Sequence, residues 1–301
     1  MKAWLNGEFV DWQQTDVSLL SHSFGRGSAI FEVLDIVPTE SGPAYFGLSE
    51  HVERFFNSAR YIGMDLPIDS ETLTAELIRS AAENQVRSGA CKFFAYYGGI
   101  EMRPVPADPK VDIAIFCIDY DLFQVKQEDL SKPVSVGIAN LRKLDPATVP
   151  VQAKVAGNYV NPFLAKVEVM KRGYEDVIML DTRGYVAEGA TSNIFFVKDG
   201  KVLTPPLSNA LPGITRRAVM EVLADIGYPC KETDMRREDL DGVDEAFYTS
   251  SLARIQPIRS IEGQSLRTRC PGPATLRLQE AMTGVYAGKN AKFNRWLTPI
   301  K

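Results

Sequence analysis

Apolar residues recur at helical spacing in several segments of the chain. The clearest stripe predicts a helix over residues 214–226. Similar spacing predicts helices over residues 50–63, 70–85 and 161–172, the first with Ser49 as its N-cap. The apolar positions of the clearest stripe are Ile214, Ala218, Val219, Val222, Leu223 and Ile226.

Short apolar runs bounded by turn residues predict strands between these helices. The Asn6-Gly7 pair predicts a hairpin within residues 3–10, and Asp199-Gly200 joins two further strands. Hairpins interspersed with helices indicate an α+β fold with two domains. Strands are expected at residues 93–97, 112–118, 134–139, 177–180, 194–197, 201–204 and 246–249.

A polar stretch that ends at Pro133 separates the two expected domains. We predict a small N-terminal domain over residues 1–120, a linker over residues 121–133 and a larger domain over residues 134–301. The length of 301 residues is sufficient for two domains of modest size. The chemistry is then expected between the two domains.

Charge and the rarer residue types argue against several classes of function. The net charge of −4 makes a nucleic-acid-binding surface unexpected. No run of 18 apolar residues occurs and residues 1–7 lack the apolar core of a signal peptide, so we expect a cytoplasmic protein without a membrane span. The cysteines are far apart and His22 and His51 are the only histidines, so no metal site is expected. Proton transfer then falls to Lys, Glu, Asp or Tyr.

Three groups along the chain together favour pyridoxal phosphate (PLP) as a cofactor. Lys154 lies among small apolar residues, which suits an amine that must lose its proton to become a nucleophile. Glu188, if buried, suits a protonated pyridine nitrogen. Gly213, Ile214 and Thr215 open a predicted helix, whose free N–H groups and dipole favour a phosphate. Each residue alone is more often an ordinary surface, loop or capping residue, but their occurrence in this order predicts a PLP site.

These stretches together resemble the class IV family of PLP-dependent aminotransferases, which have fold type IV. The resemblance extends from Ser21 to about Gly272 and is densest between Lys154 and Ser251. It implies an α+β protein in which a small N-terminal α/β domain and a larger C-terminal α/β domain hold the cofactor in the cleft between them. It also implies a homodimer or a higher homo-oligomer.

The resemblance assigns roles to individual residues. Lys154 matches the Schiff-base lysine, Tyr159 matches the tyrosine that bonds the phenolic oxygen of the cofactor, and Glu188 matches the partner of the pyridine nitrogen. Arg54, on the flank of the apolar stripe of the helix over residues 50–63, matches the phosphate-binding arginine. The other implied cofactor contacts are Ser192, Asn193, Leu211, Gly213, Ile214, Thr215, Ser250 and Ser251.

The substrate side of the site matches the family less uniformly. The stretch Leu211 to Arg216 is similar to the branched-chain amino acid aminotransferases, which implies ping-pong transfer between a branched-chain amino acid and a 2-oxo acid such as 2-oxoglutarate. Thr191-Ser192-Asn193 is closer to the D-amino acid aminotransferases and aminodeoxychorismate lyase. A D-amino acid or (R)-amine transaminase, a PLP lyase and a non-catalytic PLP-binding protein therefore stay open as alternatives.

One carboxylate-binding arginine of the family is missing, because an expected Tyr-x-Arg pattern is replaced by Phe93-Phe94-Ala95. We hypothesise that Arg26 or Arg103 binds the substrate carboxylate instead, although Arg26 suits an ordinary solvent-facing position equally well. Four aromatic residues either line a pocket for the substrate side chain or belong to the core: Phe24, Phe31, Phe93 and Tyr97.

Overall fold

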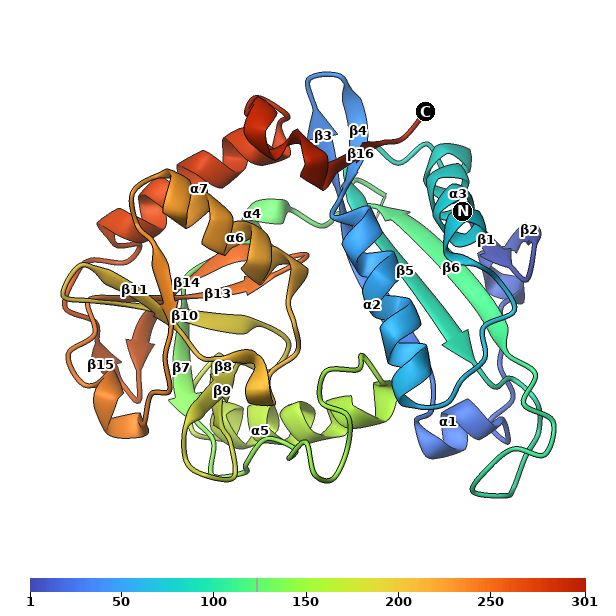
Figure 1. The fold of residues 1–301 in the computed structure, drawn as a ribbon, viewed down its shortest axis with the longest axis horizontal. Helices are drawn as coiled ribbons and strands as arrows, with labels where there is room; N and C mark the ends of the chain where they lie inside the picture. The colour runs from blue at the N-terminus through green and yellow to red at the C-terminus, as the bar shows by residue number, and fades with distance from the viewer. Residues whose placement is uncertain (123) are drawn as a thin grey trace. The chain divides into compact units, whose positions relative to one another are not determined.

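The computed structural model describes residues 1–122 and 124–301, so Phe123 of the predicted linker lies outside the described residues. The chain forms two compact units (Figure 1). Unit 1 consists of Met1–Lys126, Ala153–Asn158 and Val285–Lys301, and unit 2 consists of Gln127–Gln152 and Tyr159–Gly284. These units differ from the continuous ranges expected from the sequence, because two late segments of the chain belong to unit 1.

Unit 1 contains a seven-stranded sheet in which neighbouring strands run antiparallel. The turn at Asn6 and Gly7 joins the first two strands with positive φ angles at both residues, so the predicted hairpin is confirmed. In spatial order the strands are β16 (Leu297–Pro299), β4 (Gly42–Phe46), β3 (Ile30–Thr39), β5 (Gly89–Tyr96), β6 (Asp112–Asp119), β1 (Lys2–Leu5) and β2 (Glu8–Asp11).

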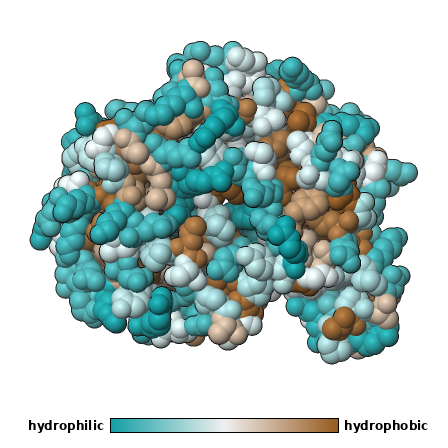
Figure 2. Space-filling model, viewed as in Figure 1, coloured by the Kyte–Doolittle hydropathy of each residue, from teal (hydrophilic) through white to brown (hydrophobic). Residues whose placement is uncertain are grey.

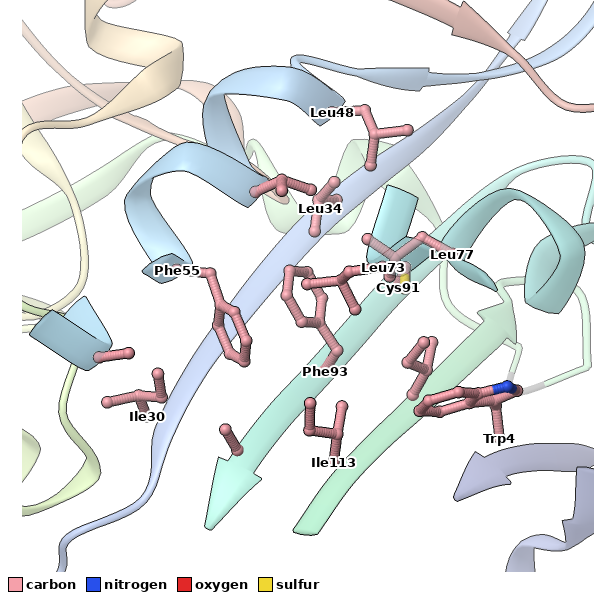
Figure 3. Close-up of a cluster of buried hydrophobic side chains, with 14 of the residues drawn as sticks. Trp4, Ile30, Leu34, Leu48, Phe55, Leu73, Leu77, Cys91, Phe93 and Ile113 are labelled. Atoms are coloured by element: carbon pink, nitrogen blue, oxygen red, sulfur yellow. The ribbon is translucent and has the colours of Figure 1, made fainter. Parts of the chain in front are cut away.

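Helices α2 (Leu48–Tyr61) and α3 (Ser70–Glu83) contribute to the core of unit 1 together with this sheet. Phe55 of α2 packs on Phe93 of β5, with ring centroids 4.7 Å apart, and both side chains are fully buried. Figure 3 shows Leu34 and Phe93 pointing from neighbouring strands into the same cluster. Removing each such side chain from water stabilises the fold by about 2–3 kcal/mol.

The predicted N-cap of α2 at Ser49 is wrong. Gly47 is the N-cap, with φ of +70°, and Ser49 lies in the first turn, where its hydroxyl donates to Glu50 Oε2 at 2.8 Å. Glycine reaches this left-handed conformation without the steric cost of a Cβ, so β4 turns almost directly into the helix. The helix itself is confirmed and begins two residues earlier than predicted, at Leu48. The short helices of unit 1 are η1 (Trp12–Gln14), α1 (His22–Arg26) and η5 (Ala291–Trp296).

Unit 2 contains a nine-stranded sheet that mixes parallel and antiparallel pairs. The predicted turn at Asp199 and Gly200 is confirmed, because it joins two antiparallel neighbours. In spatial order the strands are β12 (Cys230–Glu232), β11 (Lys201–Thr204), β10 (Asn193–Lys198), β13 (Glu245–Ser250), β14 (Arg254–Ile261), β7 (Val134–Ile138), β8 (Asp176–Leu180) and β9 (Val186–Glu188), and β15 (Gln264–Ser265) pairs with β14.

Alternating side chains of β8 join two different clusters of buried residues in unit 2. Val177 and Met179 pack with Val169 of α5 (Val160–Lys171), whereas Ile178 and Leu180 belong to a second cluster. The predicted helices over residues 70–85, 161–172 and 214–226 are confirmed, with ends that differ by one or two residues. The other helices of unit 2 are α4 (Gln127–Leu130), α6 (Ile214–Asp225), η3 (Leu207–Asn209), η4 (Arg237–Leu240) and most of α7 (Pro273–Tyr286). Helix η2 (Ala156–Tyr159) begins in unit 1 and ends at the first residue of the second segment of unit 2.

Each strand predicted from the sequence overlaps an observed one. Among the helices of residues 1–122 and 124–301, none is long and apolar enough to cross a membrane.

Candidate active site

The Lys154 segment is fixed to unit 1 by its backbone. The Lys154 N–H donates to Ser58 Oγ at 2.9 Å, and its carbonyl accepts from the Phe31 N–H at 3.1 Å. Its neighbours Ala153 and Val155 are buried in the core of unit 1. Lys154 Nζ lies 4.7 Å from the centroid of the Phe31 ring. The amine is therefore held on a rigid backbone next to an aromatic face, as a nucleophile that must be desolvated requires.

Two glycines allow the segment after Lys154 to approach the end of α1. Gly27 has φ of +68° and forms the C-cap of α1, and the Gly157 N–H donates to its carbonyl at 2.8 Å. A Cβ on Gly27 would lie 2.7 Å from the Cα of Gly157. No other residue type fits at position 27, so two of the stretches that carry the family resemblance meet in direct backbone contact.

Arg54 lies on α2 and is buried, with its guanidinium held by Glu32 of β3. Its Nε donates to Glu32 Oε1 and its Nη2 donates to Oε2, both at 2.7 Å. His51, one turn earlier on α2, donates from Nδ1 to Glu32 Oε2 at 2.7 Å. This bidentate pair fixes the plane of the guanidinium, which suits recognition of a phosphate.

The buried charges of this group have shifted pKa values. Burial raises the pKa of Glu32, but the Arg54 guanidinium and His51 outweigh it and hold the pKa at about 2. Burial lowers the pKa of His51, and Glu32 opposes this only in part. At neutral pH the group therefore consists of a carboxylate, a guanidinium and a neutral imidazole. Glu32 and His51 were not predicted from the sequence, although a histidine three residues before Arg54 on a helix lies on the same face as the arginine.

Glu188 ends β9 in unit 2 and is buried, as expected. Its Oε1 lies 2.6 Å from the ammonium of Lys143, a residue that the sequence analysis missed. Its Oε2 accepts from the Asn193 side-chain amide and from the Leu211 N–H, both at 3.2 Å. Because Lys143 lies in an irregular segment far from Glu188 in the chain, only the fold brings it to the carboxylate.

Asn193 joins two of the stretches identified from the sequence. Besides its bond to Glu188, its amide donates to the Leu211 carbonyl at 3.0 Å. A Cβ on Gly213 would overlap the Oδ1 of Asn193. Glycine at position 213 is therefore required for Asn193 to reach both partners.

The start of α6 suits an anion. Gly213 is its N-cap and supplies no side-chain cap, and Thr215 in the first turn is buried. The uncapped N–H groups and the helix dipole together favour negative charge. On β13, the buried hydroxyl of Thr249 has no hydrogen-bond partner among the described residues, just before the last residue of the strand, Ser250.

These side chains fit PLP group by group. A lysine amine suits its aldehyde, a buried carboxylate suits its protonated pyridine nitrogen, and a helix start with a neighbouring hydroxyl-bearing strand suits its phosphate. Tyr159 follows directly on the Lys154 segment as the N-cap of α5, and Ser192, Ile214 and Ser251 flank the groups described above in sequence.

The structure separates the four aromatic candidates for the substrate pocket. Phe31 is half-buried beside Lys154. Phe93 and Tyr97 belong to the core of unit 1, which is one of the two positions that the sequence left open for them. Phe93 points to the α2 side because side chains alternate along β5. Phe24 is exposed.

Both candidate carboxylate clamps lie on the surface of unit 1. Arg103 is exposed, and its Nε donates to Glu101 Oε1 at 3.0 Å while Nη2 lies 2.9 Å from Oε2. Arg26 is exposed and donates from Nη2 to the Met102 carbonyl at 3.1 Å. Each guanidinium thus already binds a residue of the loop that follows β5. That Arg26 or Arg103 binds the substrate carboxylate stays a prediction.

Comparison with known proteins gives the family. A model of the family described as amino-transferase class IV matches residues 29–261. The chain is a class IV aminotransferase. The aminotransferase is 32% identical over 301 residues to the branched-chain-amino-acid aminotransferase of Salmonella typhimurium, covering 99% of this chain and 96% of that relative.

Solved structures agree with this assignment. The branched-chain aminotransferase of Thermoproteus uzoniensis with norvaline matches with a TM-score of 0.93 and 33% identity, covering 100% of this chain and 99% of that chain. The branched-chain amino acid aminotransferase of Thermobaculum terrenum in its PLP form matches with a TM-score of 0.93 and 26% identity, covering 100% of this chain and 98% of that chain. The predicted family and mixed α+β fold are confirmed, and the Thermobaculum terrenum enzyme in its PLP form agrees with the expected cofactor.

Proposed function

We propose that this aminotransferase moves the amino group between a branched-chain L-amino acid and a 2-oxo acid such as 2-oxoglutarate by a ping-pong mechanism. The observation that carries the proposal is the match to branched-chain enzymes over nearly the whole chain. The half-buried aromatic face of Phe31 beside Lys154 suits an aliphatic substrate side chain.

Lys154 is the proposed catalytic residue. Bound PLP supplies an electron sink that stabilises negative charge on the α-carbon of the substrate. With PLP bound, the Lys154 amine would accept the proton from that carbon and hold it next to the reacting atoms. Its backbone bonds to Ser58 and Phe31 restrict where the amine can lie, which favours proton transfer along one path.

The remaining groups are proposed to hold the cofactor. Arg54, kept in place by Glu32 and His51, binds the phosphate, together with Thr215 at the start of α6. Glu188 holds the proton of the pyridine nitrogen. Tyr159 bonds the phenolic oxygen, Leu211 packs on one ring face, and the further proposed contacts are Ser192, Asn193, Gly213, Ile214, Ser250 and Ser251.

Purified protein supplied with PLP tests this function. We expect the bound cofactor to give a visible absorbance band, and we expect Lys154→Ala to abolish this band. The control variant Lys166→Ala, on the more exposed side of α5, should retain it. With 2-oxoglutarate as acceptor, L-leucine should be the best of four donors: L-leucine, L-glutamate, D-alanine and (R)-1-phenylethylamine. A preference for D-alanine or the (R)-amine would replace the branched-chain assignment with one of the alternatives, and cofactor binding without any transfer would indicate a lyase or a binding protein.

We also propose that the protein works as a homodimer. Unit 1 exposes a group of apolar side chains on α1 and the loops around it, where Leu20 and Ile100 lie next to each other because the Glu101 N–H donates to the Leu20 carbonyl at 3.2 Å. Figure 2 shows a small apolar area at the position of α1. A second copy of the chain is the occupant that the family favours. The exposed members are Leu19, Leu20, Phe24, Ile100, Met102 and Val105.

Light scattering on the purified enzyme should give about twice the mass of the chain, 33.4 kDa. Phe24→Ser together with Val105→Ser should shift the protein towards the monomer, and a monomeric wild type would rule out the dimer. The cytoplasmic location stays a prediction.

A further inference from the structure

Lys92 lies on β5 in unit 1, and its side chain points to the face of the sheet that carries Phe31. In the register of the sheet Lys92 pairs with Val33, and Phe94 pairs with Phe31. Cross-strand partners point to the same face, and successive residues of β5 point to opposite faces. Phe93 therefore packs in the core, while Lys92 and Phe94 lie on the face of Phe31.

The side-chain nitrogens of Lys92 and Lys154 both lie near the ring of Phe31. Lys92 Nζ is 5.2 Å from the Phe31 centroid and 4.9 Å from the Phe94 centroid. Lys154 Nζ is 4.7 Å from the same Phe31 ring. Two lysine side chains from distant parts of the chain thus converge on one side chain.

Lys92 lies in an environment that disfavours a positive charge on its amine. The side chain is half-buried, and among residues 1–122 and 124–301 no carboxylate forms an ion pair with it. Burial lowers the pKa of Lys92, and the nearby Lys154 lowers it further. The two aromatic faces compensate for only part of the lost hydration. An anion arriving beside Lys154 would therefore be bound favourably.

A substrate of the proposed reaction brings such an anion. In an α-amino acid the carboxylate carbon is two bonds from the amine nitrogen, and this nitrogen replaces the amine of Lys154 on the cofactor. The carboxylate must then lie within a few ångströms of the place that Lys154 Nζ occupies. The strand that carries Lys92 lacks the family arginine, and Arg26 and Arg103 are exposed with partners of their own.

We propose that Lys92 binds the α-carboxylate of the amino acid and of the 2-oxo acid. This rests on the proposed function, because it assumes a substrate with a carboxylate next to the reacting carbon. Lys92 is then a specificity-determining residue that favours amino acids over simple amines.

Binding of an unreactive acid to the holoenzyme tests this role. 4-Methylvaleric acid has the carbon skeleton of leucine without the amine, and 4-methylvaleramide is its neutral counterpart. By calorimetric titration, Lys92→Met should weaken binding of the acid at least about tenfold and change binding of the amide by less than about twofold. Lys92→Arg keeps the charge and should restore most of the affinity. Lys110→Met, which removes an exposed ammonium from the same unit, should have no effect.

Several results would overturn the proposal. One is an unchanged affinity of Lys92→Met for the acid, and another is an equal loss for acid and amide, which would indicate a packing role. A wild-type enzyme that does not bind the acid would also overturn it. A shifted pH dependence of the cofactor absorbance with unchanged acid binding would assign Lys92 to tuning of Lys154.

The experiments distinguish failure of the proposed function from failure of the proposed role of Lys92. The titration needs no turnover, so an enzyme that prefers a D-amino acid would still show the effect of Lys92→Met on acids. An enzyme that prefers (R)-1-phenylethylamine, with no effect of Lys92→Met on any acid, would remove both proposals. Far-ultraviolet circular dichroism and the cofactor absorbance establish that each variant is folded and loaded.

Discussion

Lys143 and Glu188 form a short ion pair in unit 2, with 2.6 Å between Nζ and Oε1. Both side chains are nearly buried, at 12% and 10% exposure, so solvent screens the pair only weakly. The other oxygen of Glu188, Oε2, accepts hydrogen bonds from two neutral groups, the Asn193 amide and the Leu211 N–H. Lys143 is therefore a positioning residue that fixes the direction of the Glu188 carboxylate.

Loss of Lys143 should destabilise the enzyme. Lys143→Met removes the protein cation beside the nearly buried Glu188 carboxylate, so the free energy of unfolding should fall by about 2–3 kcal/mol. Urea titration at a fixed PLP concentration measures this. The control is Lys166→Met, which breaks the more exposed pair with Asp176 and should cost less than about 1 kcal/mol. Equal losses in the two variants would contradict a special role for Lys143.

Removal of the charge of Glu188 should slow the chemical step more than substrate binding. Glu188→Gln keeps the shape of the side chain but cannot hold a proton on the pyridine nitrogen, so kcat should fall by roughly 100-fold or more. Glu188→Asp keeps the charge and should lose less. Stopped-flow absorbance of the half-reaction with L-leucine gives the rate. A Glu188→Gln enzyme with wild-type kcat would show that this carboxylate does not act on the cofactor.

Gly27 should tolerate no side chain. Gly27→Ala imposes a positive φ on alanine and a Cβ 2.7 Å from Gly157, so unfolding should be easier by about 1–3 kcal/mol. Because the contact lies in the segment after Lys154, cofactor absorbance should weaken as well. Gly25→Ala is a close control, since its Cβ would meet no atom within 4 Å. Thermal unfolding of the two holoenzymes compares them, and similar midpoints would count against the close contact.

The buried carboxylate of Glu32 should make unit 1 sensitive to acid. Its pKa of about 2 is below the ordinary value of 4.5, so its contribution to stability is complete above about pH 4.5 and is lost as the pH falls towards 2. Glu32→Gln should lower the free energy of unfolding by about 3 kcal/mol at pH 7, and this difference should narrow across that pH window.

Urea midpoints measured from pH 2 to pH 7 test this, with Glu53→Gln on the exposed side of α2 as the control. His51 also makes the folded protein less stable in acid, but this effect begins at a higher pH than that of Glu32. Its pKa is lowered from 6.5 in the folded protein, so stability falls as the pH drops below about 6.5. A difference between wild type and Glu32→Gln that stays constant down to pH 2 would refute the assignment.

Some elements were not predicted because their sequence periodicity is weak. Strand β3 has buried residues on both faces over much of its length, so its side chains do not alternate between apolar and polar. Helix α7 was not identified either, and it begins at Pro273 after an irregular stretch. By contrast, α6 has one apolar stripe and was located to within a residue.

The sequence by itself determined the family, the cofactor and the order of Lys154, Glu188 and Thr215, because each lies in a short contiguous stretch whose spacing is set by local backbone geometry. Only the tertiary structure decided which side chains accompany them. Glu32 meets Arg54, Lys143 meets Glu188 and Lys92 approaches Lys154 across sheet registers and loop paths. Such contacts depend on which strands become neighbours. Strand pairing is decided by burial of the whole hydrophobic core, and the sequence around each contacting residue does not specify it.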